Sequence, residues 1–322
     1  MRRSHPSKIV AFALAAGCAR APEAAHIPLS APAPPVVGAN AGCESCHADE
    51  AAEWRGSLHR AAHDEPSYAA SFAREPQAFC DSCHAPEGAA PQAASLGVAC
   101  TTCHASAHVS GPLAKDDTRA CASCHEFSFP DRASSLPADR MQLTETEHAG
   151  SALAARTCTD CHMPLVQGAL RPHRDHRFAA SRDVEALRRA VVVSARLLES
   201  DVVEVTLRPG LVGHAFPTGD LFRRLVVGVE LLNAEGERVD FGMQTLGRTF
   251  ELRGARQTQL ADTRPGAPGQ PEARLRFPLA GARGSRIRFW VDYQRVQGAH
   301  GEAFEVDEST RVFEDVIEGD HR

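Results

Sequence analysis

Apolar and polar residues alternate with a period of two in the second half of the chain. This alternation predicts strands with one buried face at residues 202–207, 225–231, 274–277 and 287–293. Turn-forming residues separate them at 199–201, 233–236 and 264–271. Several short strands at this spacing predict an antiparallel β-sandwich domain over residues 181–322.

The first half of the chain, residues 40–180, has a different pattern. Helical fragments such as 48–63 are joined by Pro/Gly-rich stretches such as 85–91, and large apolar side chains are few. Side chains alone are too few here to fill a core. The predicted fold class is therefore α+β, with a helical and loop domain whose core needs another component, followed by the sandwich.

One pentapeptide, Cys-x-x-Cys-His, occurs five times in this first half. Two thiols at this spacing bond covalently to the two vinyl groups of a haem, and the histidine that follows coordinates the iron. The motifs predict five covalently bound c-type haems, which supply most of the missing core. The attachment cysteines are Cys43, Cys46, Cys80, Cys83, Cys100, Cys103, Cys121, Cys124, Cys158 and Cys161. The proximal iron ligands are His47, His84, His104, His125 and His162.

Two other uses of these cysteines are considered. Zinc ribbons also use Cys-x-x-Cys pairs, but a histidine follows all five pairs here, which a ribbon does not require. A disulfide within each pair would close a strained short ring. The haem interpretation accounts for every cysteine except Cys18.

The first residues carry the features of an export signal. Basic residues including Lys8 precede a short apolar run at 9–16, which is typical of a secretory signal rather than a membrane span. Cys18 ends this run in a sequence similar to a bacterial lipobox, so residues 1–18 are expected to be a signal peptide with acylation at Cys18. Simple cleavage near this point is the alternative. Residues 19–39 are rich in Pro and Ala and predict an extended tether.

Each haem iron has a second axial position, whose occupant decides between electron transfer and chemistry. Seven further histidines are candidates. The preferred distal ligands are His59, His108, His148, His176 and His214, and either His63 or His173 could replace one of them. Methionine is the rival ligand and is scarce in this chain.

An internal repeat complicates this assignment. The sequence from Glu53 to Leu58 recurs from Glu147, each copy lying between successive motifs. His148 stands in the second copy where Trp54 stands in the first, and Leu153 stands where His59 stands. The distal ligand in the second copy is therefore open at this point.

Several longer motifs are shared with a known group of proteins. They are Trp54-x-x-Ser57-x-His59, Gly97-Val98-x-Cys100, Cys161-His162-Met163-Pro164, His176-Arg-Phe178 and Gly213-His214-Ala-Phe216-Pro217-Thr218-Gly219. In these residues the chain resembles multihaem cytochromes of the cytochrome c-554 and c-prime type, and more closely those relatives that carry a C-terminal β-sandwich. The resemblance implies closely stacked bis-histidine haems, with His59 as a distal ligand and with His214 reaching back to a haem.

The function expected from the sequence is electron transport in the bacterial cell envelope. An exported pentahaem cytochrome would exchange electrons with other redox proteins, in the periplasm or at the outer membrane, held to a membrane by lipid at Cys18. The net charge of −6 gives no sign of a nucleic-acid partner. Two alternatives remain: a reductase or oxidase of a small nitrogen or sulfur oxyanion with one open haem, and a haem subunit of a larger electron conduit.

The attachment chemistry predicts a mass. Because thioether bonds survive denaturation, the denatured protein is expected to show five haem masses above the processed polypeptide. Release of the haem by acid-acetone extraction would contradict covalent attachment.

Acylation at Cys18 predicts a change of location. The variant Cys18→Ala is expected to move the mature protein into the soluble periplasmic fraction with its haem content unchanged, because this thiol belongs to no motif. Fractionation and haem staining measure both effects. A mature N-terminus without lipid mass would count against the anchor.

Overall fold

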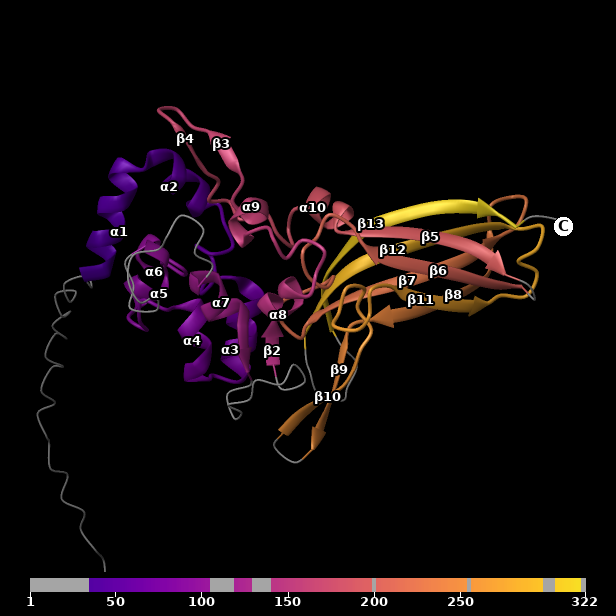
Figure 1. The fold of residues 1–322 in the computed structure, drawn as a ribbon. Coiled ribbons are helices and arrows are strands. Elements are labelled where there is room, and N and C mark those ends of the chain that lie inside the picture. Colours follow the sequence, from indigo (N-terminus) through magenta and orange to yellow (C-terminus); the bar gives the residue numbers. More distant parts are fainter. Residues whose placement is uncertain are drawn as a thin grey trace, which may run out of the picture. The chain divides into compact units, whose positions relative to one another are not determined.

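Most helices lie in the first half of the chain and the longer antiparallel strands lie in the second, so the fold is α+β (Figure 1). The computed structural model describes residues 35–104, 119–128, 140–198, 201–253, 256–297 and 305–319. The predicted signal peptide, Cys18, the predicted tether up to residue 34 and His108 lie outside these residues. In the described part of the chain, no helix is long and apolar enough to cross a membrane.

The helices are short and follow one another closely from residue 35 to residue 189. They are α1 (Pro35–Cys46), α2 (Ala48–Arg55), α3 (Pro66–Arg74), α4 (Ala78–His84), α5 (Pro91–Ala94), α6 (Cys100–His104), α7 (Arg119–His125), α8 (Thr144–Ala149), α9 (Cys158–His162) and α10 (Val184–Arg189). Proline begins α3 and α5, where its missing N–H costs nothing. Thr157 and Asp160 form a reciprocal capping box at the start of α9.

Two small hairpins interrupt the helices. Strands β1 (Glu126–Ser128) and β2 (Arg140–Leu143) pair with each other, as do β3 (Leu165–Gln167) and β4 (Pro172–Arg174). Each hairpin directly follows a Cys-x-x-Cys-His motif.

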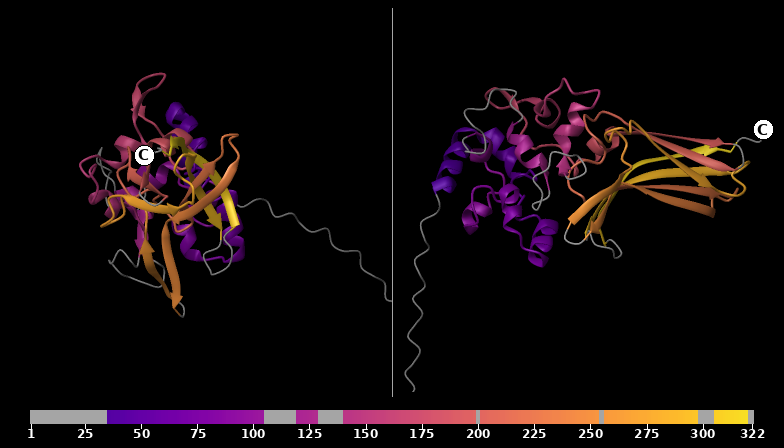
Figure 2. Two further views of the ribbon diagram at one scale, coloured as in Figure 1. Left: turned by 90° about the vertical axis from the view of Figure 1, so that its right-hand side faces the viewer. Right: turned by 60° about the horizontal axis from the view of Figure 1, so that its bottom comes forward.

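Two larger antiparallel sheets follow α10. The first has three strands in the order β11 (Ala273–Pro278), β6 (Val202–Pro209) and β5 (Val191–Leu198). The second has four, in the order β13 (Glu305–Glu318), β12 (Arg286–Gln297), β7 (Arg223–Leu232) and β8 (Arg238–Leu246). Strands β9 (Arg248–Arg253) and β10 (Arg256–Asp262) form a separate hairpin. Figure 2 shows the long strands of the two sheets in two layers.

The two sheets share one apolar core. Alternate residues of their facing sides are almost completely buried, for example Val205 on β6, Val227 on β7 and Phe289 on β12. Period-two burial of this kind is what the alternating sequence predicts. Burial of these side chains is the main source of stability for this part of the chain.

Agreement with the sequence prediction is uneven in this half of the chain. The four predicted strands are present as β6, β7, β11 and β12. Strands β5, β8 and β13 were not predicted: β8 also exposes apolar residues, including Phe241, on its outer side, and β13 is mostly polar. Such edge strands lack the clear alternation that marks a strand with one buried and one polar face.

Two predictions in the helical half need correction. The tether was expected to reach residue 39, but α1 begins at Pro35, which is favoured as a first helical residue. The helix expected over 48–63 ends at Arg55, where Gly56 caps α2, and turns follow.

Candidate haem sites

Every Cys-x-x-Cys-His motif lies at the end of a short helix. The motif histidine is the last residue of α4, α6, α7 and α9, and His47 directly follows α1. Helical spacing puts the two cysteines of each pair on one side, with the histidine beside them. All ten cysteines are free thiols, so they remain available for thioether bonds. Within the ranges that the structure describes, no group of three or more His, Cys, Asp or Glu side chains is arranged to hold a metal ion.

Cysteines of different motifs are neighbours, which shows how the attachment sites are arranged. Burial raises the pKa of Cys100, and the nearby Cys43 raises it further. Burial, together with the smaller effect of the nearby Cys124, raises the pKa of Cys103 to about 11. The first motif is therefore next to the third, and the third is next to the fourth.

The fourth motif has two more neighbours. A hydrogen bond donated to Cys124 raises the pKa of Cys83, which belongs to the second motif. A hydrogen bond between Cys121 and Cys158 raises the pKa of Cys121 and lowers that of Cys158 to about 6. The attachment sites thus follow the order first, third, fourth, fifth, with the second beside the fourth.

Three motif histidines each have another histidine ring opposite them. The ring centres are 6.3 Å apart for His125 and His59, 6.4 Å for His104 and His176, and 6.2 Å for His162 and His214. Two iron–nitrogen bonds of about 2 Å each, plus the distance from each nitrogen to its ring centre, require roughly 6 Å between the centres. The three pairs therefore match the spacing of two axial ligands on one iron.

Backbone carbonyls orient several of these rings. The Nδ1–H groups of His162, His176 and His214 donate to the carbonyl oxygens of Ala179, Arg174 and Ala215, at 3.0, 2.7 and 3.0 Å. This arrangement fixes the tautomer and leaves Nε2 free for a metal.

Burial favours the neutral form of four of the facing imidazoles. It lowers the pKa of His59 and of His214 to about 4, and it also lowers the pKa of His104 and of His125. A neutral imidazole has the lone pair that iron binding requires. The buried Nδ1 of His59 has no hydrogen-bond partner, so a polar atom there is still unsatisfied. The donor set fits a haem with two histidine ligands.

The backbone of His59 is held by the segment before the third motif. The amide of Val98 donates to the carbonyl oxygen of His59 at 2.8 Å, and the Val98 carbonyl accepts from the Trp54 indole at 2.8 Å. Gly97, the residue before Val98, has a φ of +59°. A Cβ atom at this position would be 2.4 Å from the His59 carbonyl oxygen. These contacts bring the tryptophan, the histidine and the glycine of two separate motifs next to one another.

The structure places His148 and His173 differently from the predicted ligands. Both ring nitrogens of His148 lie against carbonyl oxygens, those of Gly213 at 2.7 Å and Arg156 at 2.8 Å. This arrangement leaves no nitrogen for iron, so the prediction of His148 as a ligand is not supported. The buried His173 has Nε2 3.2 Å from each carboxylate oxygen of Glu53, which also raises the pKa of His173 despite the opposing effect of burial.

The first and second motifs have other surroundings. Among the described residues, no histidine faces His47 or His84 at the ligand spacing. His84 stacks on Tyr68, with ring centres 3.8 Å apart and planes 5° apart, and its Nδ1–H donates to the Ala62 carbonyl at 2.7 Å. His63 lies beside Asp64, with its Nδ1 3.1 Å from the carboxylate.

Two aromatic residues of the site were assigned no role from the sequence. They are Tyr68 and Phe178, and the latter ends the shared motif His176-Arg-Phe178. The Phe178 ring meets His59 edge-on at 4.2 Å and His176 at 5.9 Å, so it separates the two predicted distal ligands. Neither position stands at a fixed spacing from a cysteine pair, and only the fold brings each to its histidine.

One solved structure shares most of this fold. It is the crystal structure of a penta-haem cytochrome c552 from Thermochromatium tepidum, with a TM-score of 0.59 and 19% sequence identity, and the match covers 85% of this chain and 97% of that chain. Neither a protein-family model nor a curated protein matches the sequence. The chain therefore has the fold of a multihaem cytochrome.

The Gly97 contact predicts a large stability effect. Because φ is positive and the new methyl group would meet backbone, Gly97→Ala is expected to lower the free energy of unfolding by about 2–4 kcal/mol. Unfolding in guanidinium chloride measures this free energy. The matched control is Gly236→Ala, where φ is also positive but no atom lies within 4 Å, with an expected loss of about 1 kcal/mol. An equal loss of unfolding free energy in both variants would show that the contact with the His59 carbonyl is not the cause.

Proposed function

We propose that this chain is a pentahaem c-type cytochrome that carries electrons between redox proteins of the bacterial cell envelope. The observation that carries the proposal is the set of three histidine pairs, each joining a motif histidine to a distant histidine 6.2–6.4 Å away. Imidazoles at this spacing suit two axial bonds to one iron. The finer resemblance to the cytochrome c-554 and c-prime type is part of the proposal.

The residues of the site have separable tasks. A bound haem supplies one-electron redox chemistry. The cysteine pairs would hold the ring covalently, and in the three histidine pairs both imidazoles would bind the iron, which leaves no position for exchange at those three sites. Burial around His59 and His214 limits the access of water, and the Ala215 carbonyl keeps the His214 ring from turning. A site held this rigidly changes little on reduction, which favours fast electron transfer.

The arrangement of the motifs supports a path for the electrons. The neighbouring cysteines put the attachment sites in the order first, third, fourth and fifth. Within the first and fifth motifs, Cys46 and Cys161 are exposed, whereas the cysteines of the other motifs are half-buried. We expect redox partners to approach these two motifs. Export and lipid anchoring at Cys18 belong to the same proposal.

The rival function is reduction or oxidation of a small nitrogen or sulfur oxyanion. It needs an iron with an exchangeable axial position. The motifs of His47 and His84 are where such a position is to be sought, since the described residues place no histidine opposite them at the ligand spacing. His108, which lies outside the described residues, remains a proposed ligand.

The proposal predicts the effect of removing one distal ligand. In His214→Ala, one haem of the five is expected to become high-spin, because the iron at His162 loses its second imidazole. Visible and EPR spectra during a redox titration measure this. The matched control is His173→Gln, which keeps a hydrogen-bonding group near Glu53 and should leave the spin states unchanged. A wild-type spectrum in His214→Ala would show that His214 is not a ligand.

A further inference from the structure

The loop that carries His214 is held mainly by side chains. It joins β6 to β7 and contains no strand of its own. One of its few backbone hydrogen bonds runs from the Phe216 amide to the Pro265 carbonyl at 3.0 Å. A loop with so little regular pairing needs other contacts to place an axial ligand within the small tolerance of a metal bond.

Helix α8 supplies these contacts at one end of the loop through His148. Its Nδ1 is 2.7 Å from the Gly213 carbonyl oxygen, directly before His214. Its Nε2 is 2.8 Å from the Arg156 carbonyl oxygen, two residues before the motif that contains His162. One imidazole thus joins the two chain segments that carry the two facing histidines.

The fit around Gly213 is close. A Cβ atom at this position would be 2.8 Å from Nδ1 of His148 and 3.4 Å from Cβ of Leu153. The loop therefore approaches α8 as near as backbone can, and a change in the size or hydrogen bonding of His148 is transmitted directly to it.

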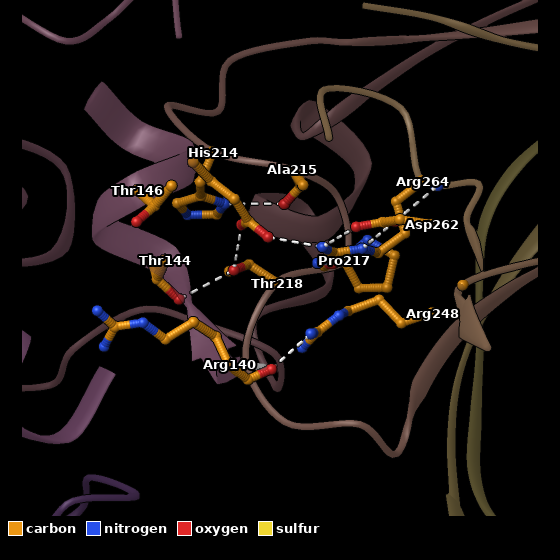
Figure 3. Close-up of polar contacts among 12 residues, drawn as sticks. Arg140, Thr144, Thr146, His214, Ala215, Pro217, Thr218, Arg248, Asp262 and Arg264 are labelled. Atoms are coloured by element: carbon orange, nitrogen blue, oxygen red, sulfur yellow. Dashed lines mark hydrogen bonds and ion pairs between the residues drawn. The ribbon is translucent and has the colours of Figure 1, made fainter. Parts of the chain in front are cut away.

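The other end of the loop is held by Glu147, the residue before His148. Its Oε2 accepts from the Thr218 hydroxyl at 2.6 Å. Since Thr218 has one hydroxyl proton and gives it to Glu147, the 2.9 Å contact with Thr144 is a donation from Thr144. Figure 3 shows Thr144, Thr218 and His214 around this point.

A buried arginine completes the arrangement. Nη2 of Arg264 donates to Glu147 Oε1 at 2.6 Å and Nη1 donates to the Pro217 carbonyl at 2.7 Å, while Asp262 accepts from the same guanidinium (Figure 3). The side chains of Glu147 and Arg264 are 0% and 3% exposed. Burial raises the pKa of Glu147, and Arg264 opposes that rise. A fully buried ion pair contributes little net stability, but it specifies one geometry.

The rings that this arrangement places are nearly parallel. The planes of His162 and His214 differ by 10°, compared with 33° for His104 and His176 and 55° for His125 and His59. We propose that Glu147 and His148 of α8 are positioning residues, which set the separation and the ring orientation of His214 relative to His162 and so fix the ligand field of that haem.

This inference rests on the proposed function, because it needs an iron between the two rings. The relative orientation of two axial imidazole planes determines the shape of the low-spin ferric EPR signal. The near-parallel pair therefore gives a signal that differs from those of the other two pairs, and it can be followed by itself. A residue with only a general stabilising role would not move this signal.

The main test is His148→Phe in the full-length holoprotein, which keeps a flat ring but removes the contacts of both ring nitrogens with carbonyl oxygens. We expect the EPR signal of the near-parallel pair to shift or to lose intensity to a high-spin signal, and carbon monoxide to bind to as much as one haem in five. His148→Gln, which retains an N–H donor, should restore much of the native signal.

A second variant tests the other end of the loop. Thr218→Val keeps the shape of the side chain but removes the contacts with Glu147 and Thr144, and the same signal should change. It also provides the test if His148→Phe fails to fold. The matched control is Thr146→Val on the same helix, whose hydroxyl donates to Glu126 and not to the loop, so its spectrum should equal that of the wild type.

The outcomes separate this inference from the proposed function. If the wild-type protein contains no covalent haem, or if His214→Ala leaves every haem low-spin, the ligand assignment fails. If His214→Ala produces a high-spin haem while Thr218→Val and a folded His148→Phe keep the wild-type signal, the ligand stands and the positioning role of α8 is wrong.

Discussion

In the proposed haem sites two metal–imidazole bonds would fix the distance between facing rings, and the helical half of this chain holds histidine pairs at that distance. The rings of His125 and His59, for example, are 6.3 Å apart although they come from different elements. Each ring must also stay neutral, which burial ensures by lowering the pKa of His59 to about 4. Short helices, capped turns and carbonyl contacts in this half are the means by which a chain with few large apolar residues keeps such rings in place.

The two copies of the internal repeat share a local backbone structure but differ in the residues that could bind iron. Gly56 and Gly150 cap α2 and α8 with nearly the same backbone angles, φ −85° and ψ −3° in the first and φ −87° and ψ −4° in the second. Trp54 and His148 then donate to the carbonyl oxygen two residues before the next motif, in both cases at 2.8 Å. His148 is thus the counterpart of Trp54 and need not be a ligand. Leu153 replaces the histidine of the first copy, and His214 supplies a ring from beyond the repeat.

The sheets and the helical half meet different physical requirements. Residues such as Val205 and Phe289 form an apolar core that is complete without any cofactor. The loop between β6 and β7 is an extension of this rigid scaffold, and it presents His214 where α8 can hold it. The buried pair of Glu147 and Arg264 adds a geometry that apolar packing would not specify.

The sequence by itself determined the attachment chemistry and the main strands, because both depend on spacing along the chain. Two residues between paired thiols and a period of two in apolar positions can be read without a fold, and the histidines at 59, 176 and 214 belong to recognisable motifs. Only the tertiary structure decided which proximal histidine each of them faces, since the paired residues are far apart in sequence. It also assigned His148 to two carbonyl oxygens, which no local pattern could show, because hydrogen-bond partners from distant segments are fixed only when the chain folds.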